Sequence, residues 1–461
     1  MQPLLIVNVV GLTPGLLRHT PRIASIGREG FQAELGGVLP GVTCSAQATL
    51  LTGRSPRDHG IVGNGWYFRD LAEVWLWRQS NHLVGCEEEK IWHAGRRRFG
   101  DGFTVANLFW WYAMHAAVHA TVTPRPVYPV DGRKIPSVYT QPPDLREELQ
   151  GRLGTFPLFQ FWGPGAGIAS SRWIAAATRQ VMESHPTAVT LCYLPHLDYD
   201  LQRFGPDAPE AALACAEIDA VVGDLTDWAL DRGHAVVVVS EYGIVPVRDG
   251  VAINRALRQA GLLAIQEVDL GWELLDPGAS EAFAVADHQL AHVYVRDPSR
   301  IAEVRDVLRG IDGVADVLDR ETQRDHGLDH PRSGELVAIS DADRWFTYYY
   351  WLDDQRMPDF ARTVDIHRKP GYDPVELFLD PRLSCPKLRI AAKLLARKVG
   401  FRTVMDLIGT DPRIVRGSHG RLPDDPSEGP LLICSDRRFQ RAKLPMTDVR
   451  DLLLDVAGAD G

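Results

Sequence analysis

The sequence has few cysteines, no excess of positive charge and no long apolar run, and each shortage narrows the possible classes of protein. Its six cysteines in 461 residues form no CxxC pair and no closely spaced framework, so we expect reduced thiols and a cytoplasmic location. With 50 basic and 60 acidic residues the net charge is −10, which argues against a nucleic acid polymer as partner. No apolar run reaches the ~18–20 residues of a membrane span, so no membrane partner is expected.

Short apolar runs rich in β-branched residues alternate with amphipathic stretches. Such runs are typical of strands that are buried on both faces of a mostly parallel sheet. Helical patterns lie at 170–185 and 209–233, and this alternation predicts an α/β fold with a doubly wound sheet. The first run is better read as a buried strand than as a signal peptide, because it lacks a basic segment in front. The predicted strands are 4–10, 188–194, 235–240, 291–295, 335–340 and 430–435.

The length exceeds what one hydrophobic core usually supports, so an elaborated domain or two domains are expected. Residues 246–330 contain a helical stretch and a small strand-helix-strand pattern, which we interpret as an inserted subdomain. It would divide the core into 1–245 and 331–461. The Pro-rich stretch 124–144 predicts an extended surface excursion.

Polar residues follow several predicted strands. In doubly wound sheets ligands bind at the carboxyl ends of the strands, so these residues are the candidates for a site. They include Thr43 and Cys44 after a Pro-Gly turn, the loop 195–202, the SEYG stretch 240–243 and the GSHG stretch 417–420.

Together these stretches resemble the type I phosphodiesterase / nucleotide pyrophosphatase family of the alkaline phosphatase superfamily. The likeness rests on VGLTP (10–14), PGVTCSAQATLLTGRSPRDHGIVGN (40–64), ANLFWWY (106–112), YLPHLDYDLQRFGP (193–206), SEYG (240–243) and RGSHG (416–420). They follow the family's order over residues 4 to about 436. The resemblance implies a sheet of the alkaline phosphatase type with a smaller inserted subdomain.

The resemblance also implies chemistry. Thr43 matches the family's nucleophile, which attacks phosphorus with the help of two divalent cations, usually zinc. Asn64 matches an asparagine that donates to a phosphoryl oxygen. A helix that begins at Thr43 would direct its free N–H groups toward an anion. The alternative is structural: Thr43 caps a helix and Asn64 closes a turn.

The family's metal ligands are only partly present. Its first aspartate falls on Val10, and two of its histidines fall on Gln202 and Tyr242. What remains is Asp198, Glu241 and His419, with Gln202 as a weak oxygen donor. Two zinc ions need more ligands than this. We therefore expect one divalent ion, which is zinc by the family resemblance, with magnesium or manganese as the alternatives.

Other residues are open candidates, each with a structural alternative. A replacement metal site would draw on His196, on Asp287, His288 and His292, or on Asp365, His367, Lys369 and Asp373. Cys44 would be either an acidified thiol or a small buried side chain. Trp110, Trp111 and Tyr112 would either line a leaving-group pocket or belong to the core. Arg125 and Arg133 would either meet a phosphate or stay solvated.

The sequence thus predicts a metal-dependent hydrolase of phosphate esters, of the phosphodiester or nucleotide pyrophosphate type, with a small phosphorylated substrate. The alternative is a pseudoenzyme, a binding protein that keeps the fold and the anion pocket without hydrolysis. A third possibility is a related reaction, such as hydrolysis of a phosphonate or sulfate ester or phosphoryl transfer.

Overall fold

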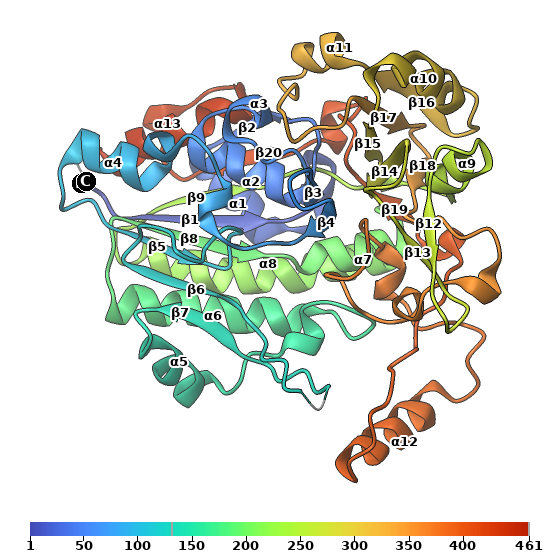
Figure 1. The fold of residues 1–461 in the computed structure, drawn as a ribbon. Coiled ribbons are helices and arrows are strands. Elements are labelled where there is room, and N and C mark those ends of the chain that lie inside the picture. Colours follow the sequence, from blue (N-terminus) through green and yellow to red (C-terminus); the bar gives the residue numbers. More distant parts are fainter. Residues whose placement is uncertain (131, 460–461) are drawn as a thin grey trace.

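A nine-stranded sheet forms the centre of the molecule (Figure 1). The computed structural model describes residues 1–130 and 132–459. The sheet order is β21-β2-β20-β9-β1-β8-β5-β6-β7. Across the sheet, these strands are β21 Lys443–Pro445, β2 Phe31–Gly36, β20 Leu431–Cys434, β9 Ala235–Val239, β1 Leu4–Val9, β8 Val189–Leu194, β5 Val105–Leu108, β6 Ala120–Pro124 and β7 Val138–Gln141.

The five strands at the middle of this sheet are parallel. β1 pairs in parallel with β8 and β9, and β5 pairs in parallel with β8 and β6. Antiparallel pairs occur only toward the two edges, at β20 with β9 and β2, and at β7 with β6. The predicted class, a mostly parallel α/β sheet, is confirmed.

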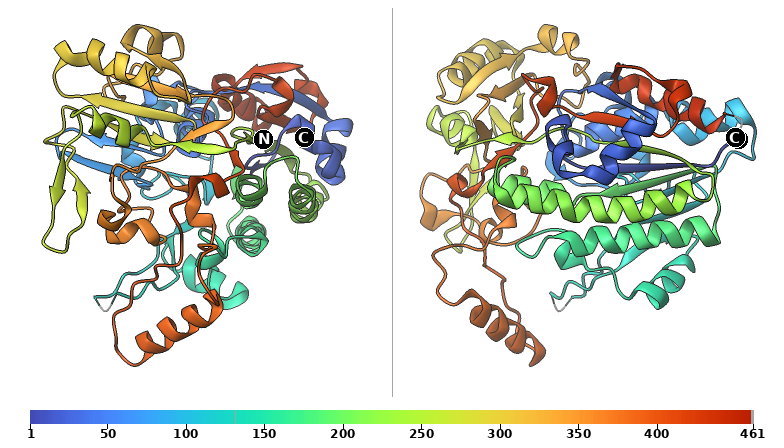
Figure 2. Two further views of the ribbon diagram at one scale, coloured as in Figure 1. Left: turned by 90° about the vertical axis from the view of Figure 1, so that its right-hand side faces the viewer. Right: turned by 180° about the vertical axis from the view of Figure 1, so that it is seen from behind.

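Helices cover both faces of the sheet, as Figure 1 and Figure 2 show. α8 contacts α1, α6 and α7 on one face, and α13 contacts α2 and α4 on the other. The helices are α1 Pro21–Glu29, α2 Thr43–Thr52, α3 Pro56–His59, α4 Ile91–Phe99, α5 Leu145–Leu153, α6 Ile168–Ser184, α7 His196–Phe204, α8 Pro209–Leu230, α9 Ile253–Gln259, α10 Ile301–Arg309, α11 Arg320–Asp325, α12 Pro386–Lys398 and α13 Val449–Ala457.

The burial of each strand matches its place in the sheet. Every residue of β1 and β8 is buried, because both strands have neighbours on each side and helices above and below. Each fully buried Leu, Ile or Val side chain stabilises the fold by about 1.5–3 kcal/mol. β2 lies near an edge, and its residues alternate between buried and more exposed positions.

A second sheet packs beside the first. Its order is β14-β15-β17-β16, with all pairs antiparallel. Smaller pairs are β3 with β4, β10 with β19, β11 with β18, and β12 with β13. The strands are β3 Gly65–Phe68, β4 Glu73–Leu76, β10 Val245–Pro246, β11 Asp249–Val251, β12 Ile265–Glu267, β13 Glu273–Leu275, β14 Ala282–Asp287, β15 Leu290–Val295, β16 Val314–Leu318, β17 Leu336–Ser340, β18 Arg344–Phe346 and β19 Gly417–Ser418.

All six predicted strands exist, but two of them lie outside the mostly parallel central sheet; of these, 291–295 falls inside the predicted subdomain and 335–340 falls outside it. The runs 291–295 and 335–340 form β15 and β17 of the antiparallel second sheet. A two-residue turn, His288 and Gln289, joins β14 to β15, and so short a connection permits only antiparallel pairing. The second sheet extends past residue 330, while the division at 1–245, 246–330 and 331–461 stays a prediction.

Two segments extend from the body of the molecule. The stretch 124–144 contains the ends of the β6–β7 hairpin, with a bridge between Val127 and Ile135. Helix α12 projects at the same end of the molecule, held by two extended connections (Figure 1). Among the described residues we find no helix whose length and apolar content suit it to crossing a bilayer.

Candidate active site

The candidate site residues meet at the carboxyl edge of the central sheet. Asp198 lies in the first turn of α7, which follows β8, and Glu241 and Tyr242 follow β9. β2 is antiparallel to β20, which is antiparallel to β9, so β2 and β9 end at the same edge. Thr43 begins α2 after β2, and its side chain therefore reaches the same place.

A chain of hydroxyl and carboxyl groups joins Thr43 to Asp198. Thr43 Oγ1 lies 3.0 Å from the Tyr242 hydroxyl, which donates to Asp198 Oδ1 at 3.3 Å. Burial raises the pKa of Tyr242 well above its usual value, so the phenol keeps its proton. A phenol carries a single proton, and while Tyr242 donates it to Asp198, Thr43 must be the donor to Tyr242.

Asp198 is bonded on both oxygens. Gln202 Nε2 donates to Asp198 Oδ2 at 2.8 Å, and Tyr372 donates to Gln202 Oε1 at 3.2 Å. His419 Nε2 lies 3.8 Å from Asp198 Oδ1, and His419 Nδ1 lies 2.7 Å from the Gly41 carbonyl.

Four rings stack beside these groups. Tyr242 lies on His419 with ring centres 3.6 Å apart and planes 7° apart. His288 lies on the other side, 3.6 Å from His419 and 3.8 Å from Tyr372. His288 occupies the β14–β15 turn with a φ of 61°, which suits a two-residue hairpin. The stack fixes the position of the Tyr242 hydroxyl.

Glu241 is fully buried beneath Thr43. Its Oε1 accepts hydrogen bonds from Asn8 Nδ2 and Gln47 Nε2, each at 2.5 Å. Gln47 lies one turn after Thr43 on the same face of α2, and its own oxygen accepts from the Trp111 backbone N–H at 2.6 Å. Glu241 Oε2 has no hydrogen-bond partner among the described residues.

Asn64 joins the start of α2 to the second sheet. Its Oδ1 accepts from the Cys44 backbone N–H at 3.1 Å. Its backbone N–H and its Nδ2 both donate to Asp287, at 2.7 and 2.9 Å. Asp287 therefore holds the amide that the family resemblance assigns to phosphoryl binding.

Burial shifts the charge of these groups. It raises the pKa of Asp198 and of Asp287 to about 7, against the hydrogen bonds that lower both values. It raises the pKa of Glu241 to about 8 and lowers that of His419 to about 3. Near pH 7 the three carboxyl groups therefore carry less negative charge than they would in water, which reduces repulsion of an anionic substrate.

The residues present do not fit a two-metal centre. Val10, where the resemblance expects a carboxylate, has no donor atom and is fully buried. Tyr242 fills the place of a histidine with a ring stacked on His419. Within residues 1–130 and 132–459, no group of three or more His, Cys, Asp or Glu side chains is placed to hold a metal ion.

Only some of the candidates for a replacement metal site lie beside Thr43 and Asp198. Asp287 and His288 arrive, as described above. His292 bonds to the Val62 carbonyl and the Gly334 N–H, and His196 lies 3.0 Å from Glu217. In the 364–374 loop, Lys369 pairs with Asp373 and Glu376, the Asp365 N–H donates to Glu376, and burial lowers the pKa of His367.

The surroundings of the remaining candidates decide between their functional and structural interpretations. Burial raises the pKa of Cys44 well above its usual value, which disfavours a thiolate. Trp110 and Tyr112 belong to hydrophobic cores, whereas Trp111 is half-buried and packs on Trp77 at 4.8 Å. Arg125 and Arg133 lie on the β6–β7 hairpin, outside the hydroxyl-carboxyl chain.

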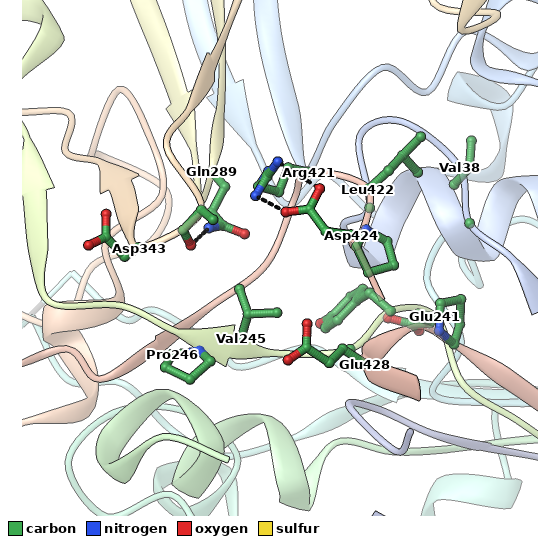
Figure 3. A pocket seen from close by; sticks show the side chains of 17 residues that line it. Val38, Glu241, Val245, Pro246, Gln289, Asp343, Arg421, Leu422, Asp424 and Glu428 are labelled. Atoms are coloured by element: carbon green, nitrogen blue, oxygen red, sulfur yellow. Dashed lines mark hydrogen bonds and ion pairs between the residues drawn. The ribbon is translucent and has the colours of Figure 1, made fainter. Parts of the chain in front are cut away.

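A pocket of about 220 Å³ reaches the site from the surface (Figure 3). Glu241, Tyr242 and Gly41 form its inner end, and Gln289 and Glu428 line its walls. Arg421 lies at its rim and is paired with Asp424 at 3.0 Å. The pocket thus borders the two residues that replace the family's Asp-His pair, which are themselves 0% and 5% exposed.

Fold and site together define an alkaline-phosphatase-type α/β protein with a hydroxyl at the start of a helix and carboxyl groups around it. The family model for type I phosphodiesterase / nucleotide pyrophosphatase matches residues 4–373. The chain belongs to this family.

Known proteins resemble the chain to different extents. An uncharacterized pyrophosphatase/phosphodiesterase of Schizosaccharomyces pombe is 22% identical over 247 residues, which are 52% of this chain and 42% of that protein. Phosphonoacetate hydrolase of Sinorhizobium meliloti 1021, in complex with phosphonoformate, is 15% identical with a TM-score of 0.60, over 99% of this chain and 96% of that chain. Murine ectonucleotide pyrophosphatase / phosphodiesterase 5, inactive and in complex with AMP, is 15% identical with a TM-score of 0.58, over 100% and 96%. The two solved structures support the fold.

Sequence reasoning missed three residues of the site. Asn8 is a polar residue inside the apolar run LLIVNVV, and this exception was a usable signal. Gln47 follows Thr43 by four residues and so shares its helix face. Tyr372 carried no signal, because it comes from a loop whose place in the fold depends on the second sheet.

Proposed function

We propose that this chain hydrolyses a small phosphate ester, of the phosphodiester or nucleotide pyrophosphate type, with Thr43 as nucleophile. Family membership supports the class of reaction. The observation that carries the proposal is the hydrogen-bond chain from Thr43 through Tyr242 to Asp198. A threonine hydroxyl needs a base to take its proton, and in this proposal the hydrogen bonds through Tyr242 connect it to such a base, Asp198.

The proposed reaction has two steps. Thr43 Oγ1 forms a bond to phosphorus while the bond from phosphorus to the leaving oxygen breaks, and the leaving oxygen departs as an anion that takes its proton from solvent. The Thr43 proton passes to the Tyr242 oxygen as the Tyr242 proton passes to Asp198. Water then attacks phosphorus, the bond from phosphorus to Thr43 Oγ1 breaks, and the phosphate product leaves while the proton lost by the water goes to solvent. The proton on Asp198 returns through Tyr242 and restores the Thr43 hydroxyl.

The proposed phosphoryl site is the start of α2. Free N–H groups of a helix start attract an anion, and Thr43 begins such a helix. Asn64 would turn its Nδ2 from Asp287 to a phosphoryl oxygen when the substrate binds. Asp287 receives two hydrogen bonds from Asn64 without substrate and so sets the starting orientation of its amide.

The predicted divalent ion stays a proposal. Its donors would be Asp198, Gln202, Glu241 and His419, of which Glu241 Oε2 and His419 Nε2 have no partner among the described residues. Gln202 and both oxygens of Asp198 are already engaged with protein groups. We therefore assign each step above to protein groups. A measurement of metal content would test whether an ion binds. The cytoplasmic location is likewise a prediction.

The alternative function is that of a pseudoenzyme. The low exposure of Thr43, 4%, and Asp198, 8%, favours it, because the substrate would have to displace packed side chains. Hydrolysis of a phosphonate or sulfate ester is a third proposal, since the same pocket would suit these tetrahedral groups.

An assay with bis-p-nitrophenyl phosphate separates these proposals. The parent, Thr43→Ala and Thr52→Ala are compared after chelation and after adding zinc, magnesium or manganese. Thr52 lies on the same helix, and its side chain bonds to the nearby backbone of Ala48 and Arg54, so it is the matched control. We expect Thr43→Ala to lose at least about a thousandfold in kcat, with Thr52→Ala unchanged. Equal activity of parent and Thr43→Ala would end the proposal, and thermal shifts with phosphate esters but no turnover would favour the pseudoenzyme.

A further inference from the structure

The segment 381–405, which we name the basic arm, is the part of the chain least covered by the rest. It contains α12, none of whose residues is buried. Leu388, Leu395 and Val399 are 71%, 63% and 66% exposed. The arm projects away from both sheets in each view (Figures 1 and 2). An apolar surface that water contacts so fully needs an explanation.

Exposed apolar side chains gather at this end of the molecule. Ten of the eighteen large apolar side chains that are exposed in the described residues lie in the arm or in the tip of the β6–β7 hairpin. The two segments touch, because Arg402 donates to the Val130 carbonyl. The ten are Val127, Tyr128, Val130, Ile135, Leu388, Leu394, Leu395, Val399, Phe401 and Val404. If these side chains were exposed singly over the whole surface, they would not be concentrated at one end of the molecule.

The arm is also strongly basic. In a chain whose net charge is −10, residues 381–405 contain seven basic residues and no acidic one. The basic residues are Arg382, Lys387, Arg389, Lys393, Arg397, Lys398 and Arg402. An anionic surface would therefore attract this arm and repel most of the remaining surface.

The two faces of α12 differ. Its inner face bonds to the returning chain: Arg389 pairs with Asp406 at 2.6 Å, Lys393 also bonds to Asp406, and Arg397 donates to Thr403. These bonds hold the helix while its outer face stays free. Spacings of seven and four residues put Leu388, Leu395 and Val399 together on that outer face.

Two lysines flank this apolar face. Lys387 and Lys398 lie on the same side of the wheel, eleven residues and about three turns apart, and both are exposed. Lysines beside an apolar stripe are typical of helices that lie in a lipid interface, with ammonium groups at the headgroups. The helix is 13 residues or about 20 Å long, too short to span a bilayer.

We propose that the basic arm docks this protein on the surface of an anionic lipid membrane. Leu388, Leu395 and Val399 enter the acyl boundary, and Lys387 and Lys398 contact the anionic headgroups. A second copy of the chain is a poorer occupant, because two arms would bring fourteen like charges together. The proposal departs from the expectation of no membrane partner, which rested on the lack of a spanning run.

Co-sedimentation of the full chain with vesicles tests the proposal. One vesicle contains phosphatidylcholine with phosphatidylglycerol, and the other contains phosphatidylcholine alone. We expect at least about tenfold more protein on the anionic vesicles, with binding that weakens as salt is raised. Equal sedimentation with both vesicles, or with neither, would overturn the proposal.

Variants locate the contact on the arm. Leu395→Asp with Val399→Asp, and separately Lys387→Glu with Lys398→Glu, should reduce binding to the level of the neutral vesicles. Leu213→Asp on α8 is the control, because Leu213 is 67% exposed and lies on another surface. Equal loss in the Leu213 control would overturn the assignment.

Other occupants give different outcomes. If sedimentation velocity shows a dimer that Leu395→Asp with Val399→Asp converts to monomer, and no vesicle binds, the arm is a self-association surface and the lipid proposal is wrong. Binding to poly-glutamate but not to vesicles would indicate an acidic protein partner, and the lipid proposal would be wrong in that case too. None of these readouts depends on hydrolysis, so the test is independent of the function proposed for Thr43.

Discussion

Replacing Asp287 by asparagine should change how the free energy of unfolding depends on pH. Asp287 is 1% exposed and accepts two hydrogen bonds from Asn64. Burial nevertheless raises its pKa from 3.8 to about 7. The folded protein therefore holds a proton that the unfolded chain has released over this range of pH.

The sign and size follow from the two pKa values. Below pH 4 Asp287 is protonated in both the folded and the unfolded state, so its ionisation does not change the free energy of unfolding. Between pH 4 and 7 the unfolded chain loses the proton while the folded chain keeps it, so the free energy of unfolding falls as pH rises. A shift of about 3 pKa units corresponds to about 4 kcal/mol, reached near pH 7 and constant above it.

An asparagine side chain at position 287 does not titrate, but it loses one of the two hydrogen bonds from Asn64. Its amide nitrogen can accept neither of the two N–H groups of Asn64, so one donor is left unpaired at about 1–3 kcal/mol at every pH. At pH 4 the Asp287→Asn variant should be less stable than the parent by that amount. At pH 8 it should be the more stable of the two, because the difference moves by up to about 4 kcal/mol.

Urea unfolding followed by circular dichroism, at steps from pH 4 to 8 and with chelator present, measures this difference. Asp231→Asn is the control, since Asp231 is exposed at the end of α8. Its difference from the parent should be small and flat. If the Asp287→Asn difference also stays constant from pH 4 to 8, Asp287 is ionised throughout, and the account of a buried neutral acid is wrong.

Two further variants test buried polar groups. Lys369→Met removes the partner of Asp373 and Glu376, which lie 2.8 and 2.7 Å from its amine with exposures of 1%, and should cost about 3–5 kcal/mol in urea unfolding at pH 7. Burial raises the pKa of Asp373, so the cost should shrink toward pH 4 as Asp373 is protonated; a cost that does not change would refute that cause. Tyr242→Phe should lower kcat about a hundredfold with little change in KM, because it interrupts proton transfer but keeps the stack on His419. An unchanged kcat would remove Tyr242 from the proton path.

Much of the fold was predictable because strand signals are local. The continuous apolar runs at β1, β8 and β9 reflect burial on both faces, and the structure has all three in the parallel centre of the sheet. The sheet to which β15 and β17 belong was not predictable in this way. It depends on the turn at His288 and Gln289, where the sequence lacks the glycine or asparagine that usually signals a two-residue hairpin.

The site was predictable only where it follows the order of the chain. Thr43, Asp198 and Glu241 each follow a strand of the central sheet, so topology brings them to one edge. The contacts among them were not predictable. The side chain of Tyr242 reaches both Thr43 and Asp198 only because His419 and His288 stack beside it, and the pairing of those rings requires the second sheet in place.

Two residues that depart from the family pattern are bonded to the same retained carboxyl group, and this bears on whether the site is remodelled or decayed. Gln202 and Tyr242 stand where histidines are expected, and each donates to a different oxygen of the retained Asp198. Loss of selection on separate ligands would satisfy both oxygens of Asp198 only by coincidence, since an unpaired buried carboxylate is the usual result of losing a partner. The Gln202→His and Tyr242→His double variant should then gain metal affinity without gaining stability, because it frees Asp198. A double variant that is more stable without metal than the parent would show that the two residues were never fitted to Asp198.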